Sequence, residues 1–326
     1  MAKNSGKTVA LNHLIQESMK GDIKLGIMST GRDGESIDLV TEGEKPKIFV
    51  GESTFIVTTT ELLPLGDAIV EIMGITNYRT PLGEILIGRV RAGGQIQISG
   101  PQTLKEIKEI ANIMLNLGAE LVIIDGALDR RSAATPSISQ ATILSTGAVL
   151  SRDMNKVIEE TIHITNLFNL SPIEDENIRK IIEETIKNNQ IAIIDGELNL
   201  TPIHMKTALN SGHIIGESIK DNSKYILIPG SLVKNTLEDI IRSTNKYRNV
   251  DIVVTDGTKI FISPKDWLKF MRYGFRVKVL NPINLIAITL NPYAPQGYYF
   301  DPKELLDRMK YYIKDIPVLD VVLGGE

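Results

Sequence analysis

The feature that most limits the fold of this chain is a short, continuously apolar segment in its first half. Residues 121–124 read Leu-Val-Ile-Ile, follow a helical pattern over 102–117 and end in Asp125-Gly126. Strands without polar alternation are typical of parallel sheets whose two faces are both covered by helices. The segment therefore predicts a parallel α/β sheet with an acid at the carboxyl end of one buried strand.

Short apolar segments alternate with helical periodicity on both sides of this strand, as expected for α/β proteins. Two further segments, 82–90 and 95–99, alternate with period two around Ala92-Gly93-Gly94 and predict an antiparallel hairpin insertion. The other elements expected before residue 170 are strands at 24–28, 47–50, 54–58 and 142–150, and helices at 7–20, 61–73 and 153–168.

A second alternating set follows the junction Asn169-Leu170-Ser171-Pro172. It predicts strands at 191–194, 225–228, 251–254, 276–280, 285–290 and 318–323, and helices at 174–189, 232–246, 264–273 and 302–314. The sequence thus indicates two domains, a first over 1–168 and a second α/β domain over 169–326.

The beginning of the sequence carries the pattern of a phosphate-binding loop. Asn4-Ser5-Gly6-Lys7-Thr8 runs directly into the expected helix at 7–20. In such loops the backbone N–H groups hold the phosphates, the lysine neutralises the outer phosphates, and the hydroxyl ligates Mg²⁺. We therefore expect Asn4, Ser5, Gly6, Lys7 and Thr8 to bind a nucleotide, with Thr8 on the metal and Lys7 in a catalytic role.

One position of the loop pattern is not matched. The first glycine of the pattern is replaced by Met1. Phosphate loops normally follow a buried strand. We therefore expect a phosphate-loop domain whose first strand is missing from this sequence.

Three groups of polar residues are candidates for the rest of the site. Asp125 is expected on the metal side with a catalytic role, because such sites pair the loop hydroxyl with an acid at a strand end. In the turn Thr30-Gly31-Arg32-Asp33-Gly34-Glu35, Asp33 and Glu35 are candidate metal ligands and Arg32 a phosphate contact; the alternative is a solvated turn. Arg130 is either a phosphate contact or part of a surface ion pair.

Asp-Gly recurs after apolar segments at Asp125, Asp195 and Asp256. A duplicated domain would produce this recurrence, and so would the general preference for Asp-Gly in turns. The unequal spacing favours the turn interpretation.

Charge and composition exclude several classes of function. The net charge is −4 without a basic block, which argues against nucleic acid as a partner. The chain has no cysteine, which excludes disulfides and thiolate sites, and no apolar run long enough to span a bilayer. We expect a cytoplasmic protein with no membrane partner.

Four segments together resemble the smaller subunit of the lysine 5,6-aminomutase reactivase. They are 2–8, 30–35, 123–130 and 147–154. The resemblance implies a P-loop NTPase-like first domain that binds ATP and Mg²⁺. It also implies a chaperone that acts with a larger MutS-like subunit to replace damaged cobalamin by adenosylcobalamin in an aminomutase of lysine or ornithine fermentation.

Other functions remain open at the level of sequence. The loop also resembles that of the small GTP-binding protein of molybdenum-cofactor nucleotide assembly, and the fold outline is similar to dethiobiotin synthetase, an ATP-dependent ligase. Both families are shorter than this chain. A guanine-reading Asn-Lys-x-Asp is not found at Leu290-Asn291-Pro292, which favours ATP over GTP. A third alternative is a scaffold whose loop no longer binds nucleotide.

Overall fold

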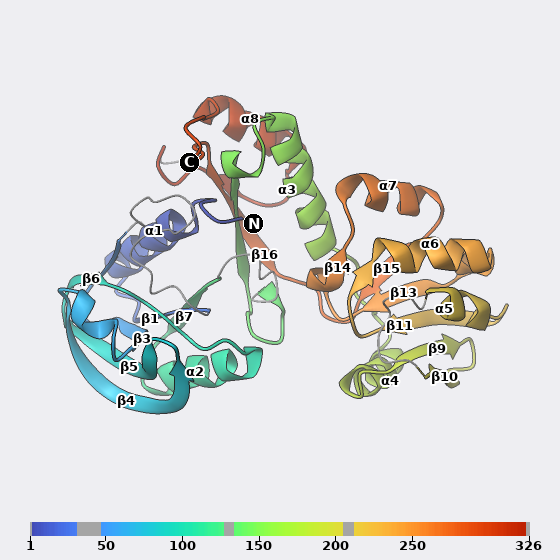
Figure 1. Cartoon of the computed structure of the whole chain (residues 1–326), viewed down its shortest axis with the longest axis horizontal. Helices are drawn as coiled ribbons and strands as arrows, with labels where there is room; N and C mark the ends of the chain where they lie inside the picture. Colours follow the sequence, from blue (N-terminus) through green and yellow to red (C-terminus); the bar gives the residue numbers. More distant parts are fainter. Residues whose placement is uncertain (1, 31–46, 127–133, 205–211, 324–326) are drawn as a thin grey trace. The chain divides into compact units, whose positions relative to one another are not determined.

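The computed structural model describes residues 2–30, 47–126, 134–204 and 212–323 of this mixed α/β chain (Figure 1). The chain divides into two compact units that differ from the contiguous division 1–168 and 169–326. The reason is that the last strands return to the first part of the chain, where β16 pairs with β8. Unit 1 comprises Met1–Ala133, Ile143–Val157 and Ile286–Glu326, and unit 2 comprises Ala134–Thr142 and Ile158–Leu285.

Unit 1 contains a sheet in the order β4-β5-β3-β1-β7, a smaller sheet in the order β17-β16-β8, and the pair β2-β6. In the first sheet β1 is parallel to β3 and β7, whereas β5 is antiparallel to β3 and β4. The strands of the three sheets are β1 (Leu25–Ser29), β2 (Ile48–Val50), β3 (Phe55–Thr59), β4 (Ile69–Thr80), β5 (Gly83–Ala92), β6 (Gly94–Ile96), β7 (Leu121–Asp125), β8 (Thr142–Gly147), β16 (Leu285–Asn291) and β17 (Val318–Leu319).

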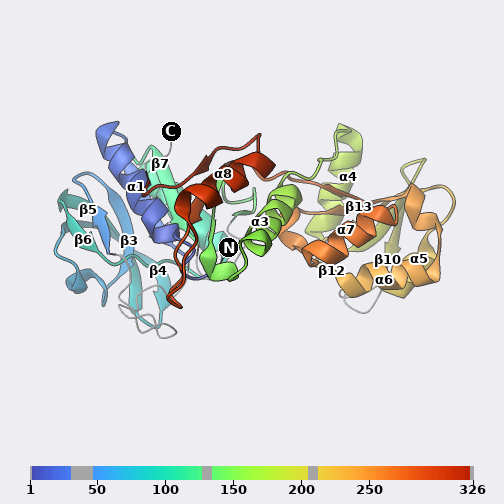
Figure 2. The ribbon, with the colours of Figure 1, turned by 90° about the horizontal axis from the view of Figure 1, so that it is seen from above.

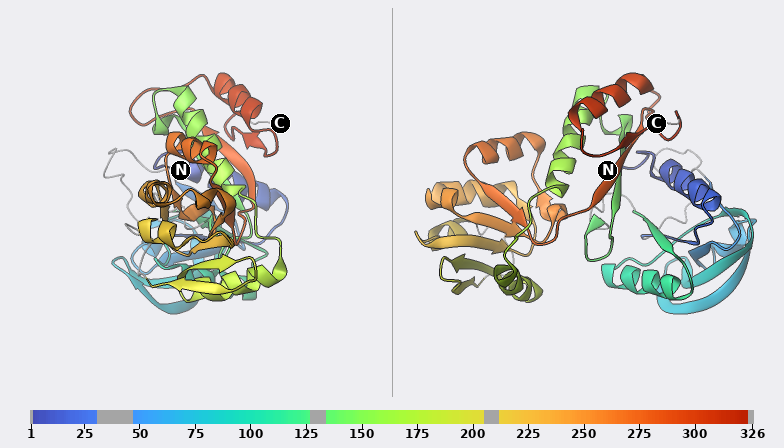
Figure 3. Two further views of the ribbon diagram at one scale, coloured as in Figure 1. Left: turned by 90° about the vertical axis from the view of Figure 1, so that its right-hand side faces the viewer. Right: turned by 180° about the vertical axis from the view of Figure 1, so that it is seen from behind.

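Two helices, α1 (Lys7–Lys20) and α2 (Leu104–Asn116), lie on opposite faces of the β1–β7 region of this sheet (Figures 1 and 3). Leu11 and Ile15 of α1 are buried in one core cluster with residues of β1, β2, β3 and β5. The burial of this helix face fixes α1, and therefore its first turn, against the sheet. The other helices of this part are α8 (Pro302–Tyr312) and α3 (Met154–Phe168), which continues into unit 2.

The antiparallel hairpin is present but is formed by other residues than expected. β5 pairs with β4 and β3, whereas β6 pairs with β2, so the turn at Ala92-Gly93-Gly94 does not join hairpin partners. The helix expected at 61–73 is wrong, because β4 begins at Ile69. The tight turn that joins β4 to β5 uses Gly83 at φ +96°, a conformation that favours glycine.

The apolar strand from which the fold class was inferred lies in a less buried place than expected. β7 pairs with β1 on one side, and within the described residues it has no partner strand on the other. Leu121 is 46% exposed, and the next three residues are half-buried. The expectation of burial on both faces was wrong, although the parallel pairing was right.

Unit 2 has a sheet in the order β10-β9-β11-β13-β15, in which β11, β13 and β15 are parallel and β9 is antiparallel to β11. Figure 2 shows α4 on one face of this sheet and α6 and α7 on the other. Its elements are α4 (Glu176–Lys187), β9 (Ile191–Asp195), β10 (Leu200–Ile203), α5 (Gly212–Ser218), β11 (Ser223–Ile228), β12 (Leu232–Val233), α6 (Lys234–Ser243), β13 (Asp251–Val254), β14 (Ile260–Phe261), α7 (Pro264–Arg272) and β15 (Arg276–Val279).

The core of unit 2 follows from the apolar periodicity of its sequence. Ile182 of α4 packs against Ala192 and Ile194 of β9, Leu227 of β11 and Val253 of β13. Most helices and strands of this part lie within three residues of the expected bounds, but β10, β12, β14 and α5 were not anticipated. None of the helices in the described part of the chain is long and apolar enough to cross a bilayer.

One buried acid holds together two distant segments of unit 2. Asp256 follows β13 and is fully buried. Its carboxylate accepts hydrogen bonds from the Thr135 hydroxyl at 2.8 Å and from the Thr258 backbone N–H at 2.9 Å. Buried carboxylates are tolerated only where such donors compensate the loss of solvent. Asp256 therefore has a structural role in attaching the segment around Thr135 to this unit.

We expect Asp256→Ala to lower the free energy of unfolding by about 2–4 kcal/mol, because it leaves buried hydroxyl and N–H donors without acceptors. Urea-induced unfolding followed by circular dichroism would measure the change. Asp195→Ala is the matched control, since Asp195 also precedes a glycine after a strand but its bonds lie at the surface. Equal losses of stability in the two variants would contradict the structural role of Asp256.

Candidate phosphate-binding site

The loop before α1 contains two residues in the left-handed conformation. Asn4 has φ +61°, and Gly6, the residue that precedes the helix, has φ +91°. Left-handed residues in such a turn direct successive N–H groups toward one side and form a concave anion-binding surface. The first hydrogen bond of the helix runs from the Ala10 N–H to the Gly6 carbonyl at 3.0 Å.

The carbonyl oxygen of Ala2 accepts hydrogen bonds from two side chains of the same loop. The Lys7 Nζ donates to this oxygen at 2.6 Å, and the buried Ser5 hydroxyl donates to it at 2.9 Å. The lysine is therefore folded back over the loop instead of extending into solvent. An ammonium group held there lies beside the same N–H groups that would face an anion.

The support of the loop comes from the opposite end of the sequence. The Asn291 Nδ2, at the end of β16, donates to the Asn4 carbonyl oxygen at 2.9 Å. Its side chain packs so closely on Gly6 that a Cβ at position 6 would lie 3.1 Å from the Asn291 Cβ. On its other side the Asn291 carbonyl oxygen would lie 1.9 Å from a Cβ at Gly147, the end of β8. The contact with Asn291 thus requires glycine at position 147, whereas at position 6 it is the left-handed backbone that favours glycine.

The N-terminus of α1 differs from most other helix starts in its lack of a capping side chain. Within the described residues no side chain caps α1, and its first turn contains no acid. The helix α6 also lacks a cap, but its first lysine, Lys234, pairs with Asp266 at 3.1 Å. A helix N-terminus without cap or acid keeps its partial positive charge available to an anion. The capped helices are α2 by Thr103, α4 by Asp175, α7 by Ser263 and α8 by Asp301.

Asp125 is the last residue of β7, and α1 begins on the side of the sheet where β1 and β7 end. The helix leads directly into β1, so its first turn returns to the carboxyl end of that strand, and α1 also contacts β7. In the parallel register Ser29 is opposite Asp125, and the Thr30 N–H donates to the Asp125 carbonyl oxygen at 3.0 Å. The start of α1, with Lys7 and Thr8, and the end of β7, with Asp125, therefore lie on the same side of the sheet; a shared site of the three residues stays a prediction.

Other expected site residues fall outside the described part of the chain. These are Arg32, Asp33 and Glu35 of the expected turn, and Arg130 after β7. Among the described residues, no group of three or more histidines, cysteines or acids has the geometry of a metal site.

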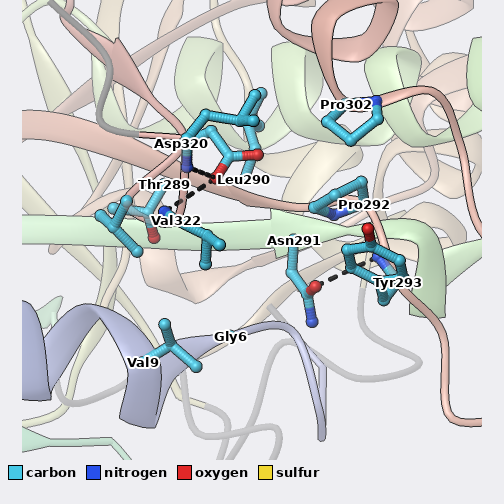
Figure 4. A pocket seen from close by; sticks show the side chains of 12 residues that line it. Gly6, Val9, Thr289, Leu290, Asn291, Pro292, Tyr293, Pro302, Asp320 and Val322 are labelled. Atoms are coloured by element: carbon cyan, nitrogen blue, oxygen red, sulfur yellow. Dashed lines mark hydrogen bonds between the residues drawn. The ribbon is translucent and has the colours of Figure 1, made fainter.

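A pocket opens directly beside the phosphate loop (Figure 4). It encloses about 470 Å³, including its open mouth, and one end is formed by Gly6 and Val9 of α1. The walls are largely apolar. They come from the end of β16, Pro302 and the turn after β17, through Thr289, Leu290, Asn291, Pro292, Tyr293, Asp320, Val321, Val322 and Leu323.

The contribution of Asn291 was not found from the sequence. Leu290-Asn291-Pro292 was considered only as a failed guanine motif, yet the side chain of Asn291 supports the loop across 287 positions. The only signal in the sequence was an asparagine at the end of an apolar segment. A single sequence does not show that this residue contacts the N-terminal loop.

Comparisons with protein-family models, curated proteins and solved structures find no match for this chain.

We expect Gly6→Ala to destabilise the protein by about 1–2 kcal/mol, because an L residue is strained in the left-handed conformation and the new methyl group meets Asn291. Urea-induced unfolding measures the loss. Gly74→Ala in β4 is the control, since a Cβ there meets no atom within 4 Å. A Gly6→Ala protein as stable as the Gly74→Ala protein would show that Asn291 and the loop are not packed as described.

Proposed function

We propose that unit 1 binds the phosphates of ATP, with Mg²⁺, at the loop before α1. The observation that carries this proposal is the folded-back Lys7, which donates to the Ala2 carbonyl oxygen at 2.6 Å. This places a cation beside the left-handed Gly6 and the uncapped N-terminus of α1. The lysine charge and the N–H groups of the uncapped helix start then belong to the same short loop, and an anion bound there would gain hydrogen bonds and charge neutralisation together.

The residues at the sheet edge have the chemistry that ATP·Mg²⁺ requires. The loop N–H groups and Lys7 would hold the phosphates, and Thr8 and Asp125 would supply hard oxygen ligands for the metal. The bound metal would neutralise charge on the phosphate oxygens. Within this division of roles, Gly6 permits the close approach of the backbone, and Asn291 maintains the shape of the loop.

We further propose that the chain acts as the nucleotide-dependent subunit of a reactivation chaperone. The client would be an adenosylcobalamin-dependent aminomutase of lysine or ornithine, and the partner a larger MutS-like subunit. The support is the resemblance of segments 2–8, 30–35, 123–130 and 147–154 to the smaller reactivase subunit. In this function the chain itself needs no cobalamin ligand, because it promotes exchange of the cofactor in another protein.

The first test is nucleotide binding. The full-length protein is expected to bind ATP·Mg²⁺ in isothermal titration calorimetry, and Lys7→Ala is expected to weaken binding by about 100-fold or more, because a close charge contact to phosphate is lost. Lys20→Ala is the matched control. Lys20 lies at the other end of the same helix and pairs with Glu17 at the surface. Identical affinities of the Lys7→Ala and Lys20→Ala proteins would refute the phosphate site.

The second test addresses the chaperone role. Mixed with the larger partner subunit, ATP, Mg²⁺ and fresh adenosylcobalamin, the chain is expected to restore turnover to an inactivated aminomutase, whereas Lys7→Ala should restore none. The rate of product formation is the measurement, and Lys20→Ala should behave as the wild type. Full reactivation by Lys7→Ala would exclude a nucleotide-dependent role, and reactivation without any nucleotide would favour a scaffold.

A further inference from the structure

We propose that the apolar pocket between the start of α1 and the end of β16 is the binding site for the base of the nucleotide. This inference rests on the proposed function, because it extends the same site from phosphates to base. The pocket shares Gly6 with the phosphate loop, so a ligand whose phosphates lie on the loop N–H groups has its remaining part at the pocket mouth. The part of the pocket that the centre of a water-sized sphere can reach is about 70 Å³, several times the space that one water molecule needs.

The walls of the pocket have the character that a flat heterocycle requires. Val9, Leu290, Pro292, Pro302, Val322 and Leu323 present aliphatic surface, and Tyr293 adds an aromatic ring (Figure 4). Several of these apolar residues remain open to solvent, including Val322 at 76% and Tyr293 at 57% exposure. Burial of such surface by a ligand is favourable, and exposed apolar groups gathered around a hollow mark a binding site more strongly than scattered ones.

The far wall of the pocket is held in place by a buried acid. Asp320 follows β17 and is 2% exposed. Its carboxylate accepts hydrogen bonds from the backbone N–H groups of Val322 and Leu323 at 2.9 and 3.1 Å. These hydrogen bonds fix the turn that carries Val322 and Leu323. This wall of the pocket therefore has a defined shape before any ligand binds.

Tyr293 is the side chain best suited to stack on a base. It starts a short hairpin in which the Phe300 N–H donates to the Pro292 carbonyl oxygen at 2.9 Å, and its ring lies 5.9 Å from that of Tyr299. The backbone N–H of Tyr293 also donates to the Asn291 Oδ1 at 3.1 Å. The backbone of Tyr293 is therefore hydrogen-bonded to the same side chain that supports the loop before α1.

The test compares ATP·Mg²⁺ with tripolyphosphate·Mg²⁺, which has phosphates but no base, by calorimetry on the full-length protein. Wild type should bind ATP at least about 10-fold more tightly than tripolyphosphate, because stacking of a base on an aromatic ring contributes substantially to affinity. Tyr293→Ala should weaken ATP binding about 10-fold and leave tripolyphosphate binding within about twofold. Val322→Trp, at an exposed position that should tolerate the larger ring, should block the pocket with the same selectivity.

Tyr299→Ala is the matched control, because Tyr299 belongs to the same hairpin but does not line the pocket. Equal loss of ATP affinity in Tyr293→Ala and Tyr299→Ala would overturn the proposal in favour of a hairpin effect. Equal wild-type affinities for ATP and tripolyphosphate would also overturn it, while leaving the phosphate site intact. Binding of neither ligand would overturn the base pocket and the proposed function together.

Discussion

The candidate site depends on one short contact, between Asn291 at the end of β16 and the loop that precedes α1. Its amide donates to the Asn4 carbonyl oxygen, and its side chain packs closely on Gly6. The left-handed conformation of Asn4 is costly without surrounding structure to fix it. Asn291 supplies that structure from a strand far away in sequence.

This contact explains why the end of the sequence belongs to unit 1. The Ser145 and Thr289 hydroxyls hydrogen-bond at 2.8 Å between β8 and β16, and Gly147 allows the Asn291 carbonyl to approach β8. The strand that supports the loop is therefore itself fixed by polar and steric contacts to β8. The same strand end leads into the pocket through Tyr293, so the loop and the pocket share one support.

Sequence reasoning was most successful where the determinants are local. The bounds of α1 and β13 were predicted from apolar periodicity and turn residues, as were the parallel strands and the general α/β class. Pairing was less predictable: β4 and β5 form the hairpin because Gly83 makes the turn between them, while Gly94 belongs to a separate strand pair. Partner choice depends on contacts between segments, which alternation of residue types does not specify.

The site shows the same limit. Lys7, Thr8 and Asp125 were identified because a loop motif and a strand end are both visible in a local stretch of sequence. The support from Asn291 and the pocket around Tyr293 were missed because they arise from segments about 290 residues apart. A local motif therefore suggested candidate binding residues, but not the distant residue that contacts their loop.

The three Asp-Gly turns show how neighbouring residues decide the role of the same dipeptide. Asp195 lies at the surface, where hydrogen bonds from Asn199 lower the pKa of its carboxyl group below the usual value. Asp256 is fully buried and fastens Thr135 to unit 2. Asp125 differs from both, because the edge that it occupies also receives the first turn of α1. Asp-Gly therefore predicts a turn after a strand, and the surroundings of the turn decide whether its acid is exposed or buried.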